Sequence, residues 1–417
     1  MIHKTSVQVV IVGGGIAGLW LLDRLSNQGM DVVLLEKNGL GNKQTLSSQG
    51  IIHGGLKYAL NGVLSPASSA IAGMPERWRA CLDGRGEVDL RGTRILSEHY
   101  YMWSTGSMRS RLKTFLGSKA LRGRIDALPP AEYPAFFSEA MSRDKVKPGG
   151  TVYKLSDFVV DTPSLLQTLA SRWHQNIRHC DHVQLEQSSQ DTGHQNTLLR
   201  IQRGTQEIVV DAAHIILCAG EGNEDLLAHW QAPAGIKKPA MQRRPLHMVS
   251  VRVKHATPAY LHCIGDSFGM TPRLTITSHP SLDSRDGEWI WYLGGDIAES
   301  GVHRDAQSQQ TMAHKELSAL FPWVDFSDAS WHSFFINRAE PHVADLQRPD
   351  NAYVEECGNV IVCWPTKLTL SPNLGDRVSA ILAARERSDT PGNTAGSHLA
   401  TLLAPANLST PPWEAFR

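Results

Sequence analysis

A short strand, a glycine-rich loop and a helix near the start of the chain constrain its fold more than any other feature. The β-branched run 7–12 has the composition of a buried parallel strand and leads directly into residues 13–18, which read G-x-G-x-x-G. The first glycine permits a tight turn, the second lets the backbone approach a diphosphate, and the third lets the helix pack closely on the strand. The pattern therefore predicts a dinucleotide-binding β-α-β unit.

A helix and a second strand complete this unit. The helical pattern from residue 16 to about residue 28 directs its first amide groups and its dipole toward the glycine loop, where they favour a diphosphate. The next strand, 31–36, ends in Glu36, whose carboxylate can accept hydrogen bonds from both hydroxyls of an adenosine ribose. We therefore expect a dinucleotide site, which by itself does not distinguish FAD from NAD.

A second motif favours FAD. Residues 45–58 read TLSSQGIIHGGLKY, and their hydroxyls, closely spaced glycines and histidine suit a loop that passes close to a flat ring. The segment HGGLKY resembles FAD-dependent glycerol-3-phosphate dehydrogenases, and SQGIIH resembles L-2-hydroxyglutarate oxidases, both of the D-amino-acid-oxidase-like (DAO) superfamily. Segments 159–163, 215–220 and 359–370 extend the resemblance over most of the chain. It implies FAD as the cofactor.

Local patterns predict the elements between these motifs. The Asp-Thr-Pro sequence at 161–163 combines a capping side chain with a proline at a helix start, so a helix should extend to about Trp173. Alternating runs over 182–210 predict a strand meander that leads into a buried strand at 215–217. A further helix is expected over about 373–385.

The resemblance also implies a fold and its division into domains. We expect an α/β fold in which a Rossmann-like FAD-binding domain of the GR2 type carries a second, mostly antiparallel α+β substrate domain. The second domain would roof the flavin, so that the two lobes enclose a cleft. The expected ranges are 1–73, 151–230 and 332–387 for the FAD-binding domain, 74–150 and 231–331 for the substrate domain, and 388–417 for an irregular C-terminal extension.

The resemblance assigns FAD contacts to four separate segments. A reduced flavin tends to carry negative charge at its pyrimidine edge, where Lys367 and the start of the helix after Pro372 would stabilise it. The expected cofactor-binding residues are Gly13, Gly15, Ile16, Ala17, Gly18, Glu36, Lys37, Thr45, Ser47, Ser48, Gln49, Gly50, Ile52, Ala219, Gly220, Lys367, Leu368 and Thr369.

Basic residues are the candidates for the catalytic site. Oxidation of a carbon that bears a hydroxyl or amino group requires a hydride acceptor, a base and groups that hold the substrate. The glycerol-3-phosphate dehydrogenase pattern surrounds the substrate with basic residues that correspond here to Lys57, His247, Arg338 and Lys367. His247 is the expected general base because an unperturbed imidazole has a pKa near neutrality. His53 is the alternative base.

Several of these residues also have a purely structural explanation. Lys57 fits an exposed lysine, His247 fits a polar residue with satisfied hydrogen bonds, and Arg338 fits a partner of Glu340. If the functional assignments hold, several cations around one cleft imply a substrate with a carboxylate or phosphate group.

We therefore expect an FAD-dependent dehydrogenase or oxidase. Its substrate would be a small anionic 2-hydroxy acid or a polyol phosphate resembling glycerol 3-phosphate, and its electron acceptor a quinone, oxygen or another carrier. An amine or amino-acid oxidase on the same scaffold is an alternative, because hydride transfer does not depend on whether oxygen or nitrogen carries the proton. A binding or assembly protein with a structural flavin is an alternative from another class.

Composition restricts the other partners. The 41 basic residues balance 41 acidic ones, which gives no broad electrostatic footprint for nucleic acid. The six cysteines form no C-x-x-C pair and indicate reduced thiols in a cytoplasmic setting, and the sequence contains no metal-ligand cluster and no run that suits a membrane-spanning helix. Residues 109–124 hold six Lys or Arg and no acidic residue, which predicts either a solvated helix or a peripheral contact with an anionic membrane, on its inner face.

Overall fold

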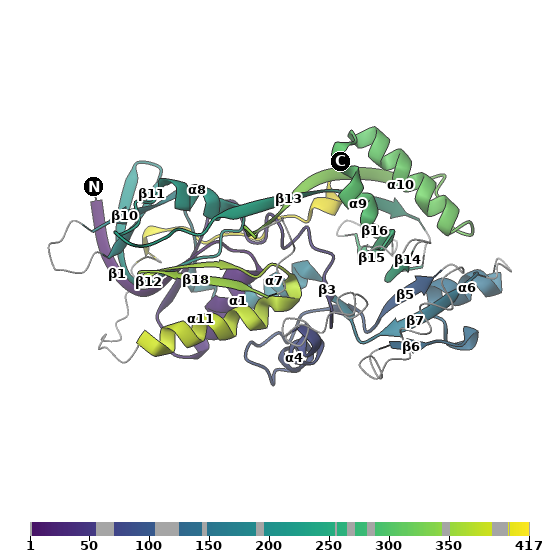
Figure 1. Cartoon of the computed structure of the whole chain (residues 1–417), viewed down its shortest axis with the longest axis horizontal. Helices are drawn as coiled ribbons and strands as arrows, with labels where there is room; N and C mark the ends of the chain where they lie inside the picture. The colour runs from purple at the N-terminus through teal and green to yellow at the C-terminus, as the bar shows by residue number, and fades with distance from the viewer. Residues whose placement is uncertain are drawn as a thin grey trace.

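Two large β-sheets organise the protein. The computed structural model describes residues 2–55, 71–104, 125–143, 148–188, 196–254, 257–264, 272–281, 288–343, 351–385, 399 and 401–416. Within these ranges, two eight-stranded sheets and one three-stranded sheet lie side by side along the long axis of the molecule (Figure 1). This mixed α/β architecture with two lobes is the fold class expected from the sequence.

The first sheet contains the dinucleotide-binding unit. Strand β1 pairs in parallel with β2 on one side and with β12 on the other. The strands of this sheet are β1 (Ile2–Val12), β2 (Val32–Glu36), β9 (Ile177–His179), β10 (His182–Gln187), β11 (Thr197–Arg203), β12 (Gln206–Leu217), β18 (Tyr353–Cys357) and β19 (Val360–Trp364).

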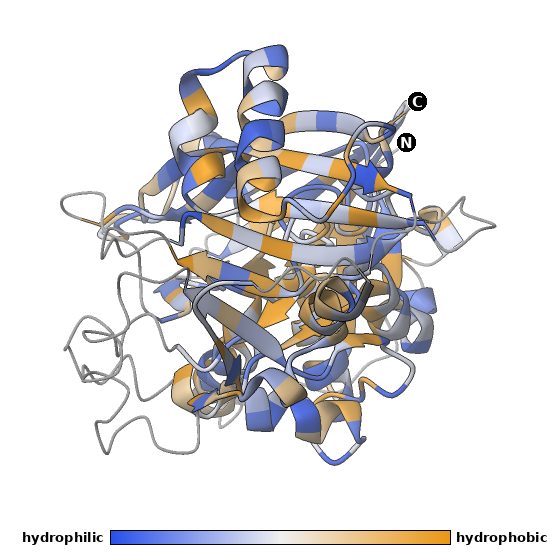
Figure 2. Ribbon diagram, turned by 90° about the vertical axis from the view of Figure 1, so that its right-hand side faces the viewer, coloured by the Kyte–Doolittle hydropathy of each residue, from blue (hydrophilic) through white to orange (hydrophobic). Residues whose placement is uncertain are grey.

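Helices cover both faces of the first sheet because alternate residues of β1 face opposite sides. Val9 and Ile11 pack with α1 (Ile16–Asn27), α7 (Thr162–Arg172) and α11 (Ser371–Arg385), whereas Val10 and Val12 belong to a second core. Helix α8 (Gly222–His229) contributes Leu227 to that second core. Figure 2 shows hydrophobic residues gathered on the central strands and hydrophilic residues on the outer helices.

Several local predictions are confirmed. Helix α7 begins where the Asp161 side chain accepts a hydrogen bond from the amide of Ser164 (3.2 Å), and it ends at Arg172. Strands β10, β11 and β12 form the expected meander, in which β10 pairs with β11 and β11 with β12 in antiparallel fashion. Helix α11 begins at Ser371 and so presents its first turn just after the expected flavin-edge segment.

The second sheet is mostly antiparallel, as expected. Only the pair β14–β5 is parallel among its described strands. In spatial order its strands are β17 (Ser330–Pro341), β13 (Met241–Val253), β16 (Trp289–Gly294), β15 (Leu274–Pro280), β14 (Leu261–Ile264), β5 (Tyr100–Ser104), β7 (Thr151–Leu155) and β6 (Ile125–Ala127). Its helices are α6 (Ala135–Arg143), α9 (Asp296–Ser300) and α10 (Ala306–Leu320).

A three-stranded sheet lies at the junction between the lobes. It is formed by β3 (Ile51–Ile52), β8 (Phe158–Val160) and β4 (Ile95–Ser97). Helix α4 (Met74–Leu82) packs Trp78 into the core of the first lobe, although the sequence assigns 74–150 to the substrate domain. Conversely, residues 332–341 lie in β17 and pair with β13 of the second sheet, although the sequence assigns them to the cofactor domain.

The C-terminal segment 401–416 crosses from the first sheet to the second (Figure 1). It forms isolated bridges from Pro405 to Arg178 and from Leu408 to Leu40. It ends with the short 3-10 turn η7 (Pro412–Glu414), where Trp413 is buried against the second sheet. No helix within the described ranges is both long and apolar enough to cross a bilayer.

Candidate cofactor and substrate site

A cavity of about 1020 Å³ lies between the two large sheets. Its floor is formed where β1, β2, β12 and β19 end, which is where open α/β sheets bind their ligands. Its roof comes from β13 and β17. The lining segments are 12–17, 35–39, 41–45, 47–49, 180, 182–185, 218–222, 225–226, 229, 243, 246, 248, 336–339 and 364–368.

Two glycines of the fingerprint are required by close backbone contacts. Gly13 has a φ of +114°, and a Cβ added there would lie 2.6 Å from the carbonyl carbon of Cys218. A Cβ on Gly18 would lie 2.0 Å from the carbonyl oxygen of Gly13. A side chain at either position would therefore separate α1 from β1 or disturb the turn between them.

The start of α1 is suited to bind an anion. The hydroxyl oxygen Oγ1 of Thr45 accepts a hydrogen bond from the amide of Ile16 (3.0 Å), which ties the loop after β2 to the helix. The first turn of α1, which is described in full, contains no acidic side chain. Because Gly15, Ile16 and Ala17 line the cavity, the amide groups and the dipole of α1 favour a diphosphate here.

Glu36 lies at the end of β2 and lines the same cavity. Its Oε2 accepts a hydrogen bond from the amide of Gly14 (2.6 Å), and its Oε1 accepts one from the amide of Asn38 (2.7 Å). Each carboxylate oxygen has more than one acceptor position, so ribose hydroxyls can also donate to this group. The carboxylate therefore fits the role expected for it.

The opposite end of the cavity lies beside the loop after β19. Lys367 and Leu368 line the cavity, and the amide of Lys367 donates to the carbonyl oxygen of Pro365 (2.7 Å) across Thr366. Thr366 has a φ of +61°, in the left-handed region that non-glycine residues rarely adopt. The 3-10 turn η6 (Leu368–Leu370) and α11 follow, so a cation and a helix start lie at the same end of the cavity.

Four of the expected cofactor-binding residues support the cavity wall without lining it. Gly18 packs against Gly13, and Gly50 (φ +69°) approaches the carbonyl oxygen of Val160. Ile52 is fully buried, and Thr369 Oγ1 accepts a hydrogen bond from the amide of His53 (3.0 Å). The other fourteen positions, from Gly13 to Leu368, line the cavity.

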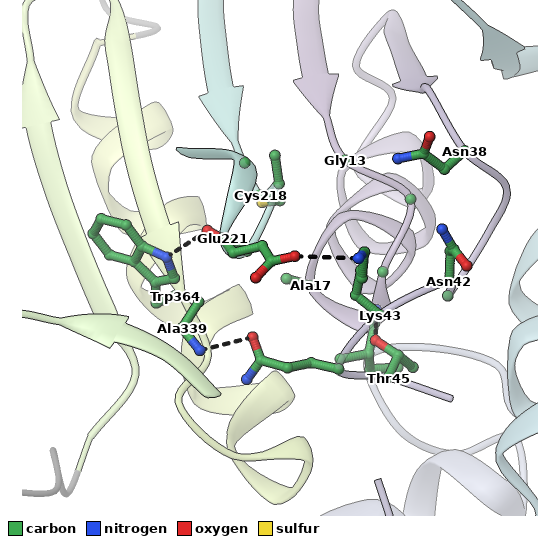
Figure 3. A pocket seen from close by; sticks show the side chains of 18 of the residues that line it. Gly13, Ala17, Asn38, Asn42, Lys43, Thr45, Cys218, Glu221, Ala339 and Trp364 are labelled. Atoms are coloured by element: carbon green, nitrogen blue, oxygen red, sulfur yellow. Dashed lines mark hydrogen bonds and ion pairs between the residues drawn. The ribbon is translucent and has the colours of Figure 1, made fainter. Parts of the chain in front are cut away.

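Three interactions join the walls of the cavity (Figure 3). Lys43 and Glu221 form an ion pair of 3.4 Å, and Gln44 Oε1 accepts a hydrogen bond from the amide of Ala339 (3.1 Å). The indole of Trp364 donates to the carbonyl oxygen of Gly220 (3.0 Å). The loop after β2, the segment after β12, β17 and β19 are therefore fixed relative to one another around the cavity.

These features fit a dinucleotide with a flavin ring, and comparison with known proteins decides the family. A family model described as FAD dependent oxidoreductase (DAO) matches residues 8–364. The chain belongs to the DAO family. It is therefore an FAD-dependent oxidoreductase, as expected, and the alternative of a binding protein with a structural flavin is not supported.

Individual proteins agree with this assignment. The chain is 44% identical over 421 residues, 99% of each chain, to the probable FAD-dependent oxidoreductase PA4991 of Pseudomonas aeruginosa. The crystal structure of PA4991 superposes on this chain with a TM-score of 0.80, over 99% of both chains and at 39% identity. Two more distant DAO-fold structures share the fold. They are glycine oxidase from Geobacillus kaustophilus (TM-score 0.62, 17% identity, 94% of this chain and 98% of the other) and L-alpha-glycerophosphate oxidase from Mycoplasma pneumoniae (0.61, 15%, 94% and 98%).

Two of the expected catalytic residues line the FAD cavity. Arg338 reaches it from β17 and Lys367 from the loop after β19, so two different sheets bring these cations to one space. Both Nη atoms of Arg338 donate to Glu299 Oε1 (3.2 and 3.3 Å). Glu340, the alternative partner considered from the sequence, binds Arg244 at 2.6 and 2.7 Å.

The structure places His247 away from the cavity. On β13, Leu246 and Met248 line the cavity, and since side chains alternate along a strand, His247 faces the opposite side. Its Nδ1 lies 3.0 Å from the carbonyl oxygen of Gly301, its Nε2 lies 3.1 Å from Ser333 Oγ, and its ring stacks on Phe335. This placement does not support the expected role as general base, and the two hydrogen bonds agree with the structural role that the sequence also allowed.

The remaining two candidates differ in what the structure says of them. His53 follows β3 and, like His247, is not among the residues that line the cavity, but its backbone amide donates to Thr369 Oγ1 beside the Lys367 end. Lys57 lies outside the described residues, as do the basic residues of 109–124.

Three residues that the sequence did not single out also shape the site. Lys43 and Glu221 span the cavity, and Tyr292 of β16 donates its hydroxyl to the carbonyl oxygen of Ser47 (2.8 Å). Complete burial raises the pKa of Tyr292 well above its usual value, so the hydroxyl remains a donor. The aromatic run 289–292 suits a strand, but the sequence contains no signal for which of its rings faces the loop 45–49.

Proposed function

We propose that this FAD-dependent oxidoreductase oxidises a small anionic substrate, a 2-hydroxy acid or a polyol phosphate, to the corresponding carbonyl compound. The observation that carries the proposal is the convergence of Arg338 and Lys367 on the cavity that holds the dinucleotide fingerprint. Guanidinium and ammonium groups bind carboxylates and phosphates with charge-assisted hydrogen bonds. Glu299 orients the Arg338 guanidinium, since both of its Nη atoms donate to one carboxylate oxygen.

Catalysis requires the substrate carbon to be held against the flavin. FAD supplies a ring that accepts a hydride. We propose that Arg338 and Lys367 hold the acidic group of the substrate, while His53 takes the hydroxyl proton in place of His247. The amide of His53 is fixed by Thr369, which follows directly on the lining residues Lys367 and Leu368.

A second candidate function is the oxidation of an amino acid. The placement of His247 favours it, because a neutral amine can lose a hydride without a base to remove a proton, whereas an alcohol requires one. The same two cations would then bind the α-carboxylate.

Anaerobic mixing of the holoenzyme with single substrates distinguishes the two functions. The panel contains 2-hydroxy acids, glycerol 3-phosphate, and primary and secondary amino acids, and bleaching of the flavin absorbance reports reduction. The proposal expects bleaching by a hydroxy compound, and bleaching by amino acids alone would establish the second candidate. Reduction by neutral donors only would exclude both. Subsequent addition of oxygen or a soluble quinone identifies the acceptor class.

Two arginine variants test the anion site. Arg338→Ala is expected to raise KM for the active substrate at least tenfold, about the value of one charge-assisted hydrogen bond, with FAD content unchanged. Arg273→Ala is the matched control, because Arg273 also binds a glutamate of the second lobe, Glu316 at 2.5 Å, but does not belong to the residues that line the cavity. Equal KM values for the two variants would exclude Arg338 as a substrate ligand.

A further inference from the structure

The loop 45–49 is the wall that the cofactor lobe shares with the second sheet. Thr45 ties its beginning to the amide of Ile16 at the start of α1 (3.0 Å). Ser47, Ser48 and Gln49 line the cavity. A displacement of this loop therefore changes the space available to the flavin ring.

Three hydrogen bonds, made by two side chains, fix the end of this loop to the second sheet. The hydroxyl of Tyr292 donates to the carbonyl oxygen of Ser47 (2.8 Å). In the opposite direction, the amide nitrogen of Gln49 donates to the carbonyl oxygens of Tyr292 (2.9 Å) and Thr275 (3.1 Å). Gly294 leaves room for Gln49, since a Cβ there would lie 2.5 Å from Gln49 Oε1.

Tyr292 itself packs against two aromatic rings. It stacks on Phe334, with an angle of 8° between the planes and 6.0 Å between ring centroids. It also contacts Trp413 of the C-terminal segment, with 5.3 Å between ring centroids. Trp413 is 1% exposed and stacks on His279 at 4.3 Å. It belongs to the same buried cluster as Met248, which lines the cavity.

The C-terminal segment also supports the opposite end of the cavity. The amide of Leu40 donates to the carbonyl oxygen of Asn407 (2.8 Å), and the amide of Ser409 donates to the carbonyl oxygen of Leu40 (3.1 Å). Leu40 lies between Gly39 and Gly41, which both line the cavity. The C-terminal segment therefore contacts the cavity wall near Glu36 and, a few residues later, the ring of Tyr292, which binds the loop 45–49.

We propose that Tyr292, held in place by Trp413, is a positioning residue for FAD, and that segment 405–414 is a strap that keeps both ends of the cofactor cavity in register. The hydroxyl of Tyr292 sets the position of Ser47 relative to α1, and Trp413 sets the position of Tyr292. In this proposal the strap acts on FAD indirectly, through Trp413, Tyr292 and Ser47 at one end and through Leu40 at the other. This inference depends on FAD binding and is independent of the substrate.

The test uses an isosteric variant and a matched control. Tyr292→Phe removes only the hydroxyl that binds Ser47. Tyr260→Phe removes a similarly buried hydroxyl, which donates to the carbonyl oxygen of Ser278 in the second lobe (2.9 Å) rather than to the loop 45–49. For both variants and the wild type, the dissociation constant of FAD is measured by fluorescence titration of the apoprotein. The absorption spectrum and midpoint potential of the flavin are measured at saturating FAD.

Tyr292→Phe is expected to weaken FAD binding about fivefold, the value of one net hydrogen bond, and to shift the flavin spectrum and potential. Tyr260→Phe is expected to leave the FAD affinity, the flavin spectrum and the midpoint potential unchanged, even if the melting temperature of this variant falls. The same FAD affinity, spectrum and potential in Tyr292→Phe as in the control would overturn the proposal.

Variants of Trp413 test the strap. Trp413→Ala is expected to weaken FAD binding at least as much as Tyr292→Phe, whereas Trp413→Phe, which keeps a ring against Tyr292, is expected to recover most of the affinity. In the double variant Tyr292→Phe/Trp413→Ala the two effects should be less than additive, because Trp413 acts through Tyr292. Full additivity, or an unchanged affinity in Trp413→Ala, would exclude the coupling.

Discussion

Lys43 and Glu221 face each other across the FAD cavity, with 3.4 Å between Nζ and Oε1 (Figure 3). The second carboxylate oxygen of Glu221 accepts a hydrogen bond from Asn337 Nδ2 (3.4 Å), so the pair connects the loop after β2 with β17. The Lys43 side chain is 60% exposed, and an ion pair in such a position contributes less than about 1 kcal/mol. Its location beside the diphosphate loop makes it relevant to cofactor retention.

Lys43→Gln is expected to weaken FAD binding by up to about fivefold, because it removes a cation near the diphosphate and the bridge to Glu221. The difference from the wild type should shrink at high salt. Titration of the apoprotein with FAD at two salt concentrations measures both effects, with Lys315→Gln on the exposed surface of α10 as the control. Identical FAD affinities for the two lysine variants would show that Lys43 has no role in retention.

Gly18→Ala is expected to destabilise the fold by several kcal/mol and to abolish FAD binding, because its Cβ would lie 2.0 Å from the carbonyl oxygen of Gly13. Gly73→Ala provides the contrast, since a Cβ there meets nothing within 4 Å, and a change of less than about 0.5 kcal/mol is expected. Urea denaturation of both variants gives the two free energies of unfolding. A stable, flavin-bound Gly18→Ala protein would contradict the close contact between α1 and β1.

His247→Ala is expected to lower the free energy of unfolding by about 2–4 kcal/mol, because it leaves a cavity and removes the partners of Ser333 and the Gly301 carbonyl group. In the folded fraction, kcat on the active substrate should remain within about twofold of the wild type, as expected for a residue outside the cavity. Thermal melting and steady-state kinetics measure the two quantities. A hundredfold loss of kcat in a stable variant would restore the general-base role.

Acid is expected to weaken the packing around Trp413. Burial lowers the pKa of His279 to about 4, below the value of about 6.5 in the unfolded chain. Between these two values the unfolded state binds a proton that the native state does not, so the free energy of unfolding falls as pH falls. From pH 7 to pH 5 the loss amounts to about 2 kcal/mol.

His279→Phe tests this prediction, because it keeps a ring against Trp413 but cannot titrate. Urea denaturation at pH 7 and pH 5 should show a smaller loss of stability in the variant than in the wild type. Equal losses would show that other groups cause the acid sensitivity, for example His99, His214 and His332, whose pKa values burial also lowers.

The sequence predicts the parts of the site that depend on local rules. The turn at Gly13, the close packing at Gly18 and the carboxylate at the end of β2 follow from neighbouring residues, and the Asp161 cap marks the start of α7 in the same way. The family resemblance assigned Arg338 and Lys367 to one site, and both line the cavity although they come from different sheets.

The face of β13 that covers the cofactor was not predictable in the same way. A shift of one residue exchanges the two faces of a strand. The sequence around Leu246, His247 and Met248 does not indicate which of these side chains faces the cavity. The strap lacks any periodic pattern because its residues bind through single backbone hydrogen bonds and one buried ring. The single aromatic residue Trp413 in a proline-rich segment is the signal that the sequence offers there.

The bridge between Leu40 and Leu408 joins residues that are synthesised at very different times, because one lies near the start of the chain and the other near its end. The glycine loop 13–18 leaves the ribosome first. Leu40 can form its backbone hydrogen bonds to Asn407 and Ser409 only after residues 407–409 have been translated, and Tyr292 can pack against Trp413 only after that residue has been translated. The fingerprint for FAD is therefore synthesised well before the residues that complete the wall at Leu40 and pack against Tyr292.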